Sequence, residues 1–384
     1  MFSRLTRSEL RKLVESRAAE LDALHNPFAT AAWVLHYIDH VAPDDGHFWA
    51  ADVEGRALML LQAEAAAPTQ ARALNNYYSS LFTPYAGALQ EGDARRLTRE
   101  LANARPALAT VDLSPMSGDD AALAAAAFVS AGWKTRRYTS FGNWYLPCEG
   151  LSFDAYMSAR PSQTVNTWTR KAKKFKPGGD TRLQLVTDPS EVAAAMRAYG
   201  MVYSKSWKQP EPYPGFIPGW AAVCAARGWL RLGIAWAGEV PIAAQFWFTK
   251  NRRAYIYKLA YDESFAKLSA GTVLSAHMFR HALDVDCVAE IDYLTGDDPY
   301  KQAWVTHRRE RVGVIACNPR TFKGATRAVY EAVGALRQRV RNRLSVADRG
   351  SAAVERFPRA DHRSESRSHA QSSIDTCTLS GAGK

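Results

Sequence analysis

Cysteine is scarce in this chain of 384 residues, and its five cysteines stand far apart. They form no C-x-x-C pair, which argues against a zinc site or a disulfide framework. We therefore expect a reducing, cytoplasmic environment. The cysteines are Cys148, Cys224, Cys287, Cys317 and Cys377.

Long hydrophobic runs are also missing. No stretch of about 18 uncharged apolar residues occurs, so we expect no membrane-spanning segment. The opening sequence "MFSRLTRSELRKLVESRAAEL" is charged and helical in pattern. It lacks the apolar centre of a secretory signal, and we expect none.

Several catalytic motifs are absent. The sequence has no G-x-S-x-G elbow and no Walker A loop. The pairs His36/His40 and His277/His281 have helical spacing but lack the glutamate of H-E-x-x-H. Because zinc needs three or four ligands, we expect no metal. Cys287 reads as a small core residue rather than a nucleophile.

Apolar and charged residues occur at ordinary globular levels, 47% and 23%, and the length is typical of two or three domains. The net charge of +11 is concentrated. Residues 301–344 hold eleven Lys/Arg against two Asp/Glu, and residues 160–182 hold seven against one. Such clusters attract phosphorylated cofactors, nucleic acid or anionic lipid, without choosing among them.

Hydrophobic periodicity predicts an α/β chain in which one arrangement of elements occurs twice. Asn26 or Thr30 is expected to cap the second helix. Helices are predicted at 7–24, 26–41, 88–104, 119–131, 160–175, 189–207, 271–283, 296–308 and 320–344. Strands are predicted at 47–64 (two strands around a Glu54-Gly55 turn), 106–114, 133–147, 181–188, 228–262 (three antiparallel strands), 287–294 and 310–318.

These elements divide the chain into four expected parts. Two α/β domains occupy 1–158 and 159–325, and a basic helix follows at 326–344. The last part, 345–384, is rich in Ser, Arg and Asp with little apolar content, and this composition is typical of a disordered tail.

The stretch "KLSAGTVLSAHMFRHAL", Lys267 to Leu283, joins a predicted strand to a predicted helix. Small residues at such a corner leave backbone N–H groups free at the positive end of the helix dipole, where an anion can bind. The alternative is a plain cap, with Ser269 or Thr272 as the N-cap residue. The corner by itself leaves both interpretations open.

Three blocks resemble a known family: "GWLRLGIAWAGEVPIAAQFWF", "AYIYKLAYDESFAKLSAGTVL" and "IDYLTGDDPYKQAWVTHRRERVG". They look like the CelD-type GNAT-fold acyltransferases, which are associated with cellulose and exopolysaccharide biosynthesis and are related to the FemABX aminoacyltransferases. "NPFATAAW" and "RPSQTVNTWTRKAKKF" fit the same resemblance, which covers residues 26–320. It implies two tandem GNAT-like α/β domains, with the acyl-donor site in the second.

The resemblance implies acetyl-CoA or another acyl-CoA as donor. The corner would grip its pyrophosphate, and the preceding strand would pair with its pantetheine arm while a backbone N–H polarises the thioester carbonyl. A plain alternating core strand is the other interpretation of "AYIYKLAY". The donor-binding residues would be Tyr257, Lys258, Leu259, Ala260, Lys267, Leu268, Ser269, Ala270, Gly271 and Thr272.

Candidate catalytic groups lie in "EIDYLTGDDPYKQAW". Glu290 and Asp292 share one face of a strand because their spacing is two. A carboxylate in a partly dry cleft can take the proton of an attacking amine, and Asp292 is the best candidate base. The resemblance places the leaving-group acid near Tyr300. Asp297 and Asp298 are read as helix caps or as further site carboxylates.

Acceptor binding is expected from Arg170, Lys171, Trp207, Lys301 and Trp304. The basic segment 166–176 is equally consistent with a solvated helix, a single-stranded nucleic-acid site or an anionic membrane surface. The basic cluster 307–311 can be a phosphate contact or a solvated face.

The expected function is acyl transfer, most simply of acetyl, to an amine or hydroxyl of a saccharide or cell-envelope precursor. One alternative is an aminoacyl or long-chain acyl transferase that uses tRNA or an acyl carrier protein. Another is a non-catalytic scaffold that docks on a polysaccharide synthase or on the inner membrane face through 320–344.

Overall fold

One large mixed sheet organises the chain. The computed structural model describes residues 2–53, 57–87, 90, 92–104, 106–175 and 179–337. Its strands are β1 (Phe2–Leu5), β2 (His47–Val53), β3 (Ala57–Ala63), β4 (Gln70–Ala73), β5 (Ala86–Gly87), β6 (Thr110–Met116), β7 (Lys134–Pro147), β8 (Thr181–Val186), β9 (Leu230–Ala237), β10 (Val240–Lys250), β11 (Arg253–Tyr261), β12 (Glu290–Asp292) and β13 (His307–Cys317). They lie in the order β1-β2-β3-β4-β6-β13-β7-β12-β11-β10-β9-β8, with β5 beside β3.

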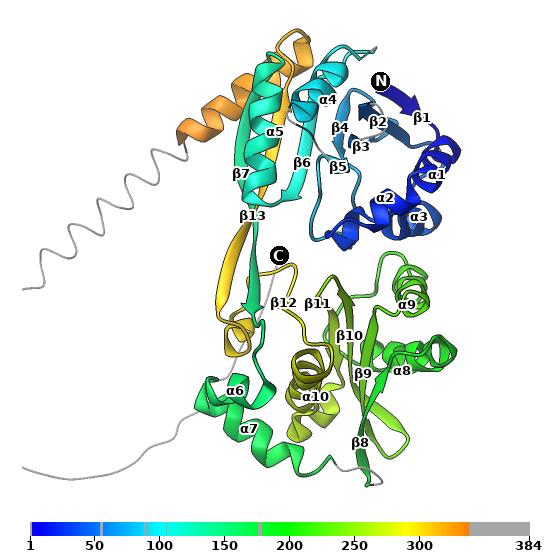
Figure 1. Cartoon of the computed structure of the whole chain (residues 1–384), viewed down its shortest axis with the longest axis vertical. Helices are drawn as coiled ribbons and strands as arrows, with labels where there is room; N and C mark the ends of the chain where they lie inside the picture. The colour runs from blue at the N-terminus through cyan, green and yellow to red at the C-terminus, as the bar shows by residue number, and fades with distance from the viewer. Residues whose placement is uncertain are drawn as a thin grey trace, which may run out of the picture. The chain divides into compact units, whose positions relative to one another are not determined.

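Helices of three kinds connect the strands (Figure 1). The α-helices are α1 (Arg7–Ser16), α2 (Ala18–Asp22), α3 (Ala31–His40), α4 (Asp93–Ala102), α5 (Gly118–Ser130), α6 (Phe153–Ser158), α7 (Ser162–Ala172), α8 (Val192–Ser204), α9 (Phe216–Ala226) and α10 (Ala270–Arg280). Short 3₁₀ turns are η1 (Pro27–Ala29), η2 (Pro189–Glu191), η3 (Glu263–Leu268) and η5 (Pro299–Ala303), and η4 (His281–Val285) is a π-turn. Residues 322–332 are helical too.

The two halves of the sheet repeat one plan. In the first, helices α1–α3 separate β1 from β2, and β4 runs parallel to β6 with α4 between them. In the second, α8 and α9 separate β8 from β9, and β11 runs parallel to β12 with α10 between them. The other pairs within each half are antiparallel. This repetition confirms the expected α/β class and its use of one unit twice.

The last strand of each half pairs with the other half. Strand β7 follows the first half but lies against β12, with Glu290 opposite Pro147 and Asp292 opposite Tyr145. Strand β13 follows the second half but lies against β6. The two exchanged strands also pair with each other, from His307↔Tyr145 to Cys317↔Lys134.

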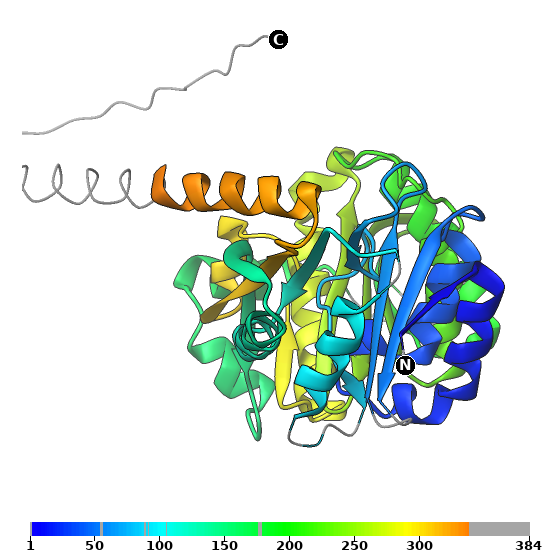
Figure 2. The same ribbon diagram turned by 90° about the horizontal axis from the view of Figure 1, so that it is seen from above.

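Helices cover both faces of the sheet (Figure 2), and each half buries apolar side chains beneath them. In the first half, α1–α3 cover one face and α4 and α5 the other. In the second half, α8 and α9 pack on one face while α6 and α10 pack on the other. Alternation along the strands explains this: Ile234, Phe246 and Phe248 enter one core, whereas Ala235 and Trp247 enter the opposite one.

Both proposed caps of the second helix exist. Asn26 caps η1 through Phe28 N, and Thr30 caps α3 through Trp33 N. The expected helix at 296–308 was wrong, because only the five-residue 3₁₀ turn η5 forms there before β13 begins. Pairing of β13 with β7 begins at His307, which leaves only residues 299–306 for a helical segment. Helix α9 was not anticipated.

The described residues up to Ala332 form one compact unit. Because each half is completed by a strand that follows the other half, the two halves stay in one unit, and the chain does not divide at the expected boundary at residue 158. The Glu54-Gly55 turn, the first residues of the helix expected at 88–104, and residues 338–384 with the expected tail lie outside the described residues. Within the described ranges, no helix is both long and apolar enough to cross a membrane.

A buried histidine makes the stability of the first half depend on pH. His36 Nε2 donates a hydrogen bond to Phe216 O at 2.8 Å, and burial lowers the pKa of His36 to about 4. Between pH 6.5 and about 4, His36 is protonated in the unfolded chain but stays neutral in the folded chain. The free energy of unfolding should therefore fall by about 1.4 kcal/mol per pH unit between about 6.5 and 4.

The substitution His36→Gln tests this, because its amide can still donate to Phe216 O but does not titrate. We expect urea titrations to show that the free energy of unfolding changes less between pH 6.5 and pH 4.5 in His36→Gln than in the wild type. The exposed His25→Gln is the matched control. If the free energy of unfolding of His36→Gln changed with pH as much as that of the wild type, groups other than His36 would cause the pH dependence.

Candidate functional site

The strand-to-helix corner is an uncapped helix N-terminus. Helix α10 begins at Ala270, and the preceding Ser269 adopts a left-handed conformation with φ of 52°. No side chain in the described part of the chain caps the helix, so neither Ser269 nor Thr272 has the expected capping role. The first-turn amides therefore point out without a capping partner.

A pocket of about 240 Å³ opens at this corner. The predicted residues Ser269, Ala270, Gly271 and Thr272 line it together with Ile242, Tyr261, Asp262, Phe265 and Ala266. A Cβ at Gly271 would lie 3.8 Å from Tyr261 Cδ1, which is an ordinary contact, so this position can accept a side chain without a clash. The expected Lys267 is exposed, and its carbonyl accepts a hydrogen bond from Lys171 Nζ at 2.7 Å.

Beside the corner, two parallel strands separate. Pairing between β11 and β12 runs only from Arg253↔Glu290 to Tyr255↔Asp292. Strand β11 continues to Tyr261, whereas β12 ends at Asp292. The backbone of Tyr257–Ala260, including Leu259, thus lies beyond the paired part, where an extended ligand can add hydrogen bonds to the free edge.

Glu211 stands at this free edge and was not singled out from the sequence. Its carboxylate accepts from Lys258 Nζ at 2.7 Å and from Tyr203 OH at 3.0 Å. Tyr78 also hydrogen-bonds to it. A carboxylate has about four lone-pair sites, so one remains for a ligand. Its only sequence signal is a lone acid in the Pro-rich and aromatic stretch "WKQPEPYPGF".

Aromatic rings and cations surround Glu211. Lys258 Nζ lies over the rings of Tyr77 and Tyr78 at 5.3 and 5.1 Å from their centroids. Burial and the neighbouring Lys258 lower the pKa of Lys208. Desolvation, reinforced by Glu211, raises the pKa of the Tyr78 hydroxyl, which stays protonated at neutral pH.

Asp292, expected to be the base, is instead saturated with partners. Oδ1 accepts from Asn143 Nδ2 and Leu294 N, and Oδ2 faces the guanidinium groups of Arg309 and Arg311. The carboxylate is 1% exposed. With both oxygens doubly engaged and no access, Asp292 holds β12, β7 and β13 together, and we correct its expected role to a structural one.

The expected roles of Glu290, Lys301 and Trp304 are also corrected, because these side chains are paired or buried. Glu290 is committed to Arg253 and Arg309. Lys301, whose side chain is 4% exposed, donates to the carbonyls of Thr295 and Gly296 and pairs with Asp298, so it braces the loop rather than facing an acceptor.

Trp304 is also buried and stacks on Phe279 with centroids 5.3 Å apart. Its carbonyl accepts from Tyr156 OH and Arg160 Nη1. The indole therefore belongs to the core of the second half and not to an acceptor surface.

Tyr300, Trp207 and Arg170 keep accessible side chains. Tyr300 is 50% exposed, and desolvation together with Asp298 raises the pKa of its hydroxyl, so the group keeps a proton to donate. Trp207 packs on Tyr261, which lines the corner pocket. Arg170 is exposed on α7, a helix with no buried residue.

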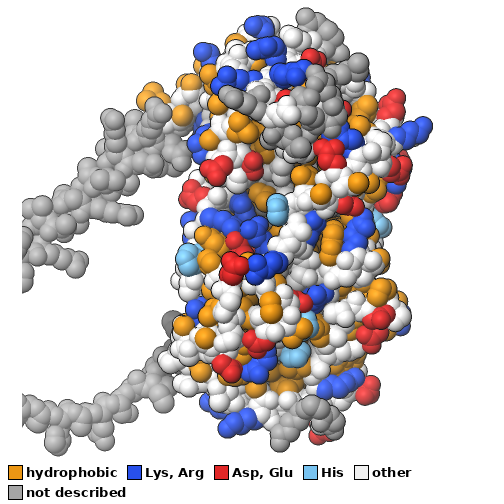
Figure 3. Space-filling view, in the orientation of Figure 1, with side chains coloured by type: hydrophobic (Ala, Val, Ile, Leu, Met, Phe, Trp, Pro, Cys, Tyr) orange, Lys and Arg blue, Asp and Glu red, His pale blue; other side chains and the backbone are white. Residues whose placement is uncertain are grey.

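Asp297 lies in the loop after β12, where Arg308 of β13 and Trp144 Nε1 of β7 hold it. On the face drawn in Figure 3, groups of basic side chains have acidic side chains beside them. Among the described residues, no three His, Cys, Asp or Glu side chains are grouped to hold a metal.

A family model described as the acetyltransferase (GNAT) domain matches residues 162–302, from α7 to η5. The chain has the GNAT acyltransferase fold. FemX has a TM-score of 0.57 at 8% identity, covering 84% of this chain and all of that one. Comparison with curated proteins found no match.

Two lysylphosphatidylglycerol-related structures share this fold. The C-terminal DUF2156 domain of a putative lysylphosphatidylglycerol synthetase from Agrobacterium fabrum has a TM-score of 0.53 at 12% identity, covering 84% of this chain and 96% of that one. L-PGS from Bacillus licheniformis has a TM-score of 0.50 at 10% identity with the same coverages. At such identities the likeness shows the fold alone.

The structural role of Asp292 can be measured. Asp292→Asn leaves the buried Arg311 without its countercharge, while Arg309 keeps Glu290, and breaking such a buried pair costs about 3–5 kcal/mol. We expect urea unfolding to show a loss of that size. The control Asp44→Asn removes an exposed partner of Arg7 and should cost at most about 1 kcal/mol. Equal losses would contradict the assigned role.

Proposed function

We propose that the second half is an acyltransferase site for an acyl-CoA donor, most simply acetyl-CoA. The observation that carries this is the uncapped start of α10 beside the free edge of β11. The amides of Ala270–Thr272 would bind the donor pyrophosphate through the helix dipole. Asp262 lines the same pocket but accepts from Ser264 and pairs with Lys205 at 3.7 Å, which reduces its repulsion toward an anion.

The donor supplies an activated acyl thioester. A backbone N–H in Tyr257–Ala260 would stabilise negative charge on its carbonyl oxygen. Glu211 would take the proton of the attacking acceptor through its remaining lone-pair site, replacing Asp292 in that role. Tyr300 would return a proton to the departing thiolate.

We propose an amine or hydroxyl of a saccharide or cell-envelope precursor as acceptor, in keeping with the CelD-type resemblance. Arg170, Lys171 and Trp207 are candidates to contact it, since Lys171 reaches Lys267 O and Trp207 packs on Tyr261 beside the corner, and Arg170 is exposed on the same helix as Lys171. The protein would act in the cytoplasm or at the inner membrane face, and the basic segment 320–344 is the proposed contact to a membrane or synthase complex.

A second candidate is an aminoacyl or long-chain acyl transfer from tRNA or an acyl carrier protein. The fold shared with FemX and with lysylphosphatidylglycerol synthetases supports it, as do the basic side chains of α7. A non-catalytic scaffold is the third, and it requires that the corner bind no donor.

Gly271→Asp tests the donor grip. The new carboxylate should repel a phosphate, whereas an acid in the first turn of a helix favours folding. We expect calorimetry to show at least about tenfold weaker acetyl-CoA binding with an unchanged melting temperature. Gly118→Asp, at the first position of α5 with open space around it, is the control. Wild-type protein that binds tRNA but not millimolar acetyl-CoA would favour the second candidate.

Glu211→Gln tests proton removal. With acetyl-CoA and glucosamine, we expect thiol release to fall about 100-fold in kcat while the donor KM stays near the wild-type value. Raising the pH should not restore the rate, because the amide cannot become a base. Glu239→Gln, on a surface turn, is the control. A variant with wild-type kcat would remove Glu211 from the mechanism.

A further inference from the structure

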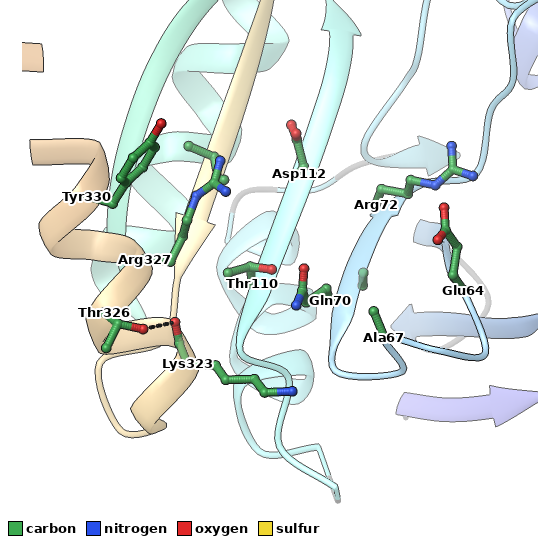
Figure 4. A pocket seen from close by; sticks show the side chains of 12 residues that line it. Glu64, Ala67, Gln70, Arg72, Thr110, Asp112, Lys323, Thr326, Arg327 and Tyr330 are labelled. Carbon is green, nitrogen blue, oxygen red and sulfur yellow. Dashed lines mark hydrogen bonds between the residues drawn. The ribbon is translucent and has the colours of Figure 1, made fainter. Parts of the chain in front are cut away.

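The first half of the sheet has a larger cavity that the proposed acyl transfer does not use. It measures about 630 Å³, within the range of small-molecule sites. Its floor is formed by β4, β6 and the end of β13, one wall by the loop before β4, and the other by the helix that begins at residue 322 (Figure 4).

Among the described residues, two cations in this cavity are not held in an ion pair, although Arg72 stands opposite Asp112 on the neighbouring strand and its charge acts on that carboxylate. Neither Arg72, on β4, nor Lys323, on the helix, forms an ion pair or a side-chain hydrogen bond within the described ranges. A third cation, Arg327, differs because Glu331 holds it at 2.6 Å. Lys323, together with the part of the Arg72 charge that Asp112 does not offset, favours a ligand that carries negative charge.

The floor between them offers oxygen acceptors. Tyr138 OH donates to Asp112 Oδ1 at 2.6 Å, and no side chain in the described part of the molecule donates to Oδ2. Gln70 and Thr110 lie on the same face of the two parallel strands. Carboxylate, amide and hydroxyl oxygens side by side suit a ligand rich in hydroxyl groups.

The rim adds an aromatic surface. Tyr330 is 68% exposed and lines the cavity, and Arg327 lies over its ring. Exposed rings beside polar side chains cover the apolar face of a flat ligand while the polar groups bind its edge. Glu64, on the opposite wall, is another acceptor.

We propose that this cavity binds a phosphorylated saccharide. Arg72 and Lys323 attract its phosphate, and Asp112, Gln70 and Thr110 accept hydrogen bonds from its hydroxyls. The site belongs to the first half and does not depend on the acyl transfer proposed for the second, so either can fail without the other.

Glucose 1-phosphate is the probe, and calorimetry measures its binding to the full chain. The binding of glucose and of inorganic phosphate is measured separately for comparison. We expect the sugar phosphate to bind more tightly than either part. Arg72→Gln and Lys323→Gln should each weaken binding about tenfold, and Asp112→Asn should weaken it less while still accepting from Tyr138. Rising salt should weaken wild-type binding more than that of either cation variant.

Arg197→Gln on α8 and Lys12→Gln on α1 are matched controls, because both residues are exposed and lie outside the cavity. Acetyl-CoA should not displace the probe. No binding at millimolar probe, or binding unaffected by Arg72→Gln and Lys323→Gln, would overturn the proposal. If inorganic phosphate bound as tightly as glucose 1-phosphate, the cavity would be a site for anions only, and the proposal that it binds a saccharide would be wrong.

Discussion

The exchange of β7 and β13 is the constraint on which the rest of the structure depends. Each strand completes the half of the sheet that it does not follow in sequence, and the two pair along their length. Because β12 is only three residues long, its position depends on β7 on one side and β11 on the other. The divergence that opens the free edge of β11 is therefore fixed by a strand from the first half.

Charge reinforces this arrangement. Asp292 on β12 meets Asn143 on β7 and Arg309 and Arg311 on β13, so one carboxylate ties three strands from both halves. Such a network costs desolvation energy and repays it only when every lone pair is used. Glu211 shows the opposite arrangement, since one of its lone-pair sites remains open beside a free strand edge. The number of unused lone-pair sites therefore distinguishes the structural carboxylate of Asp292 from the proposed reactive carboxylate of Glu211.

Local sequence signals predicted the order of strands and helices around the corner, but they left its capping open, placed a helix wrongly at 296–308 and missed α9. Small residues at 269–272 need no distant partner to form an uncapped helix start, and the three antiparallel strands of 228–262 follow from alternation. The role of Asp292 could not be predicted, because spacing shows which face a side chain takes but not that Arg309 and Arg311 will fill that face. Glu211 was missed for a similar reason: its partners come from three separate segments.

The strand exchange also sets the order in which the chain can finish folding during synthesis. Strand β6 is made early, yet one of its edges stays open until residues 307–317 leave the ribosome. For the time needed to make nearly 200 residues, the first half carries an unpaired edge of the kind that can join with other chains. Its early elements must therefore wait for β13, and translation speed becomes part of how this protein avoids aggregation.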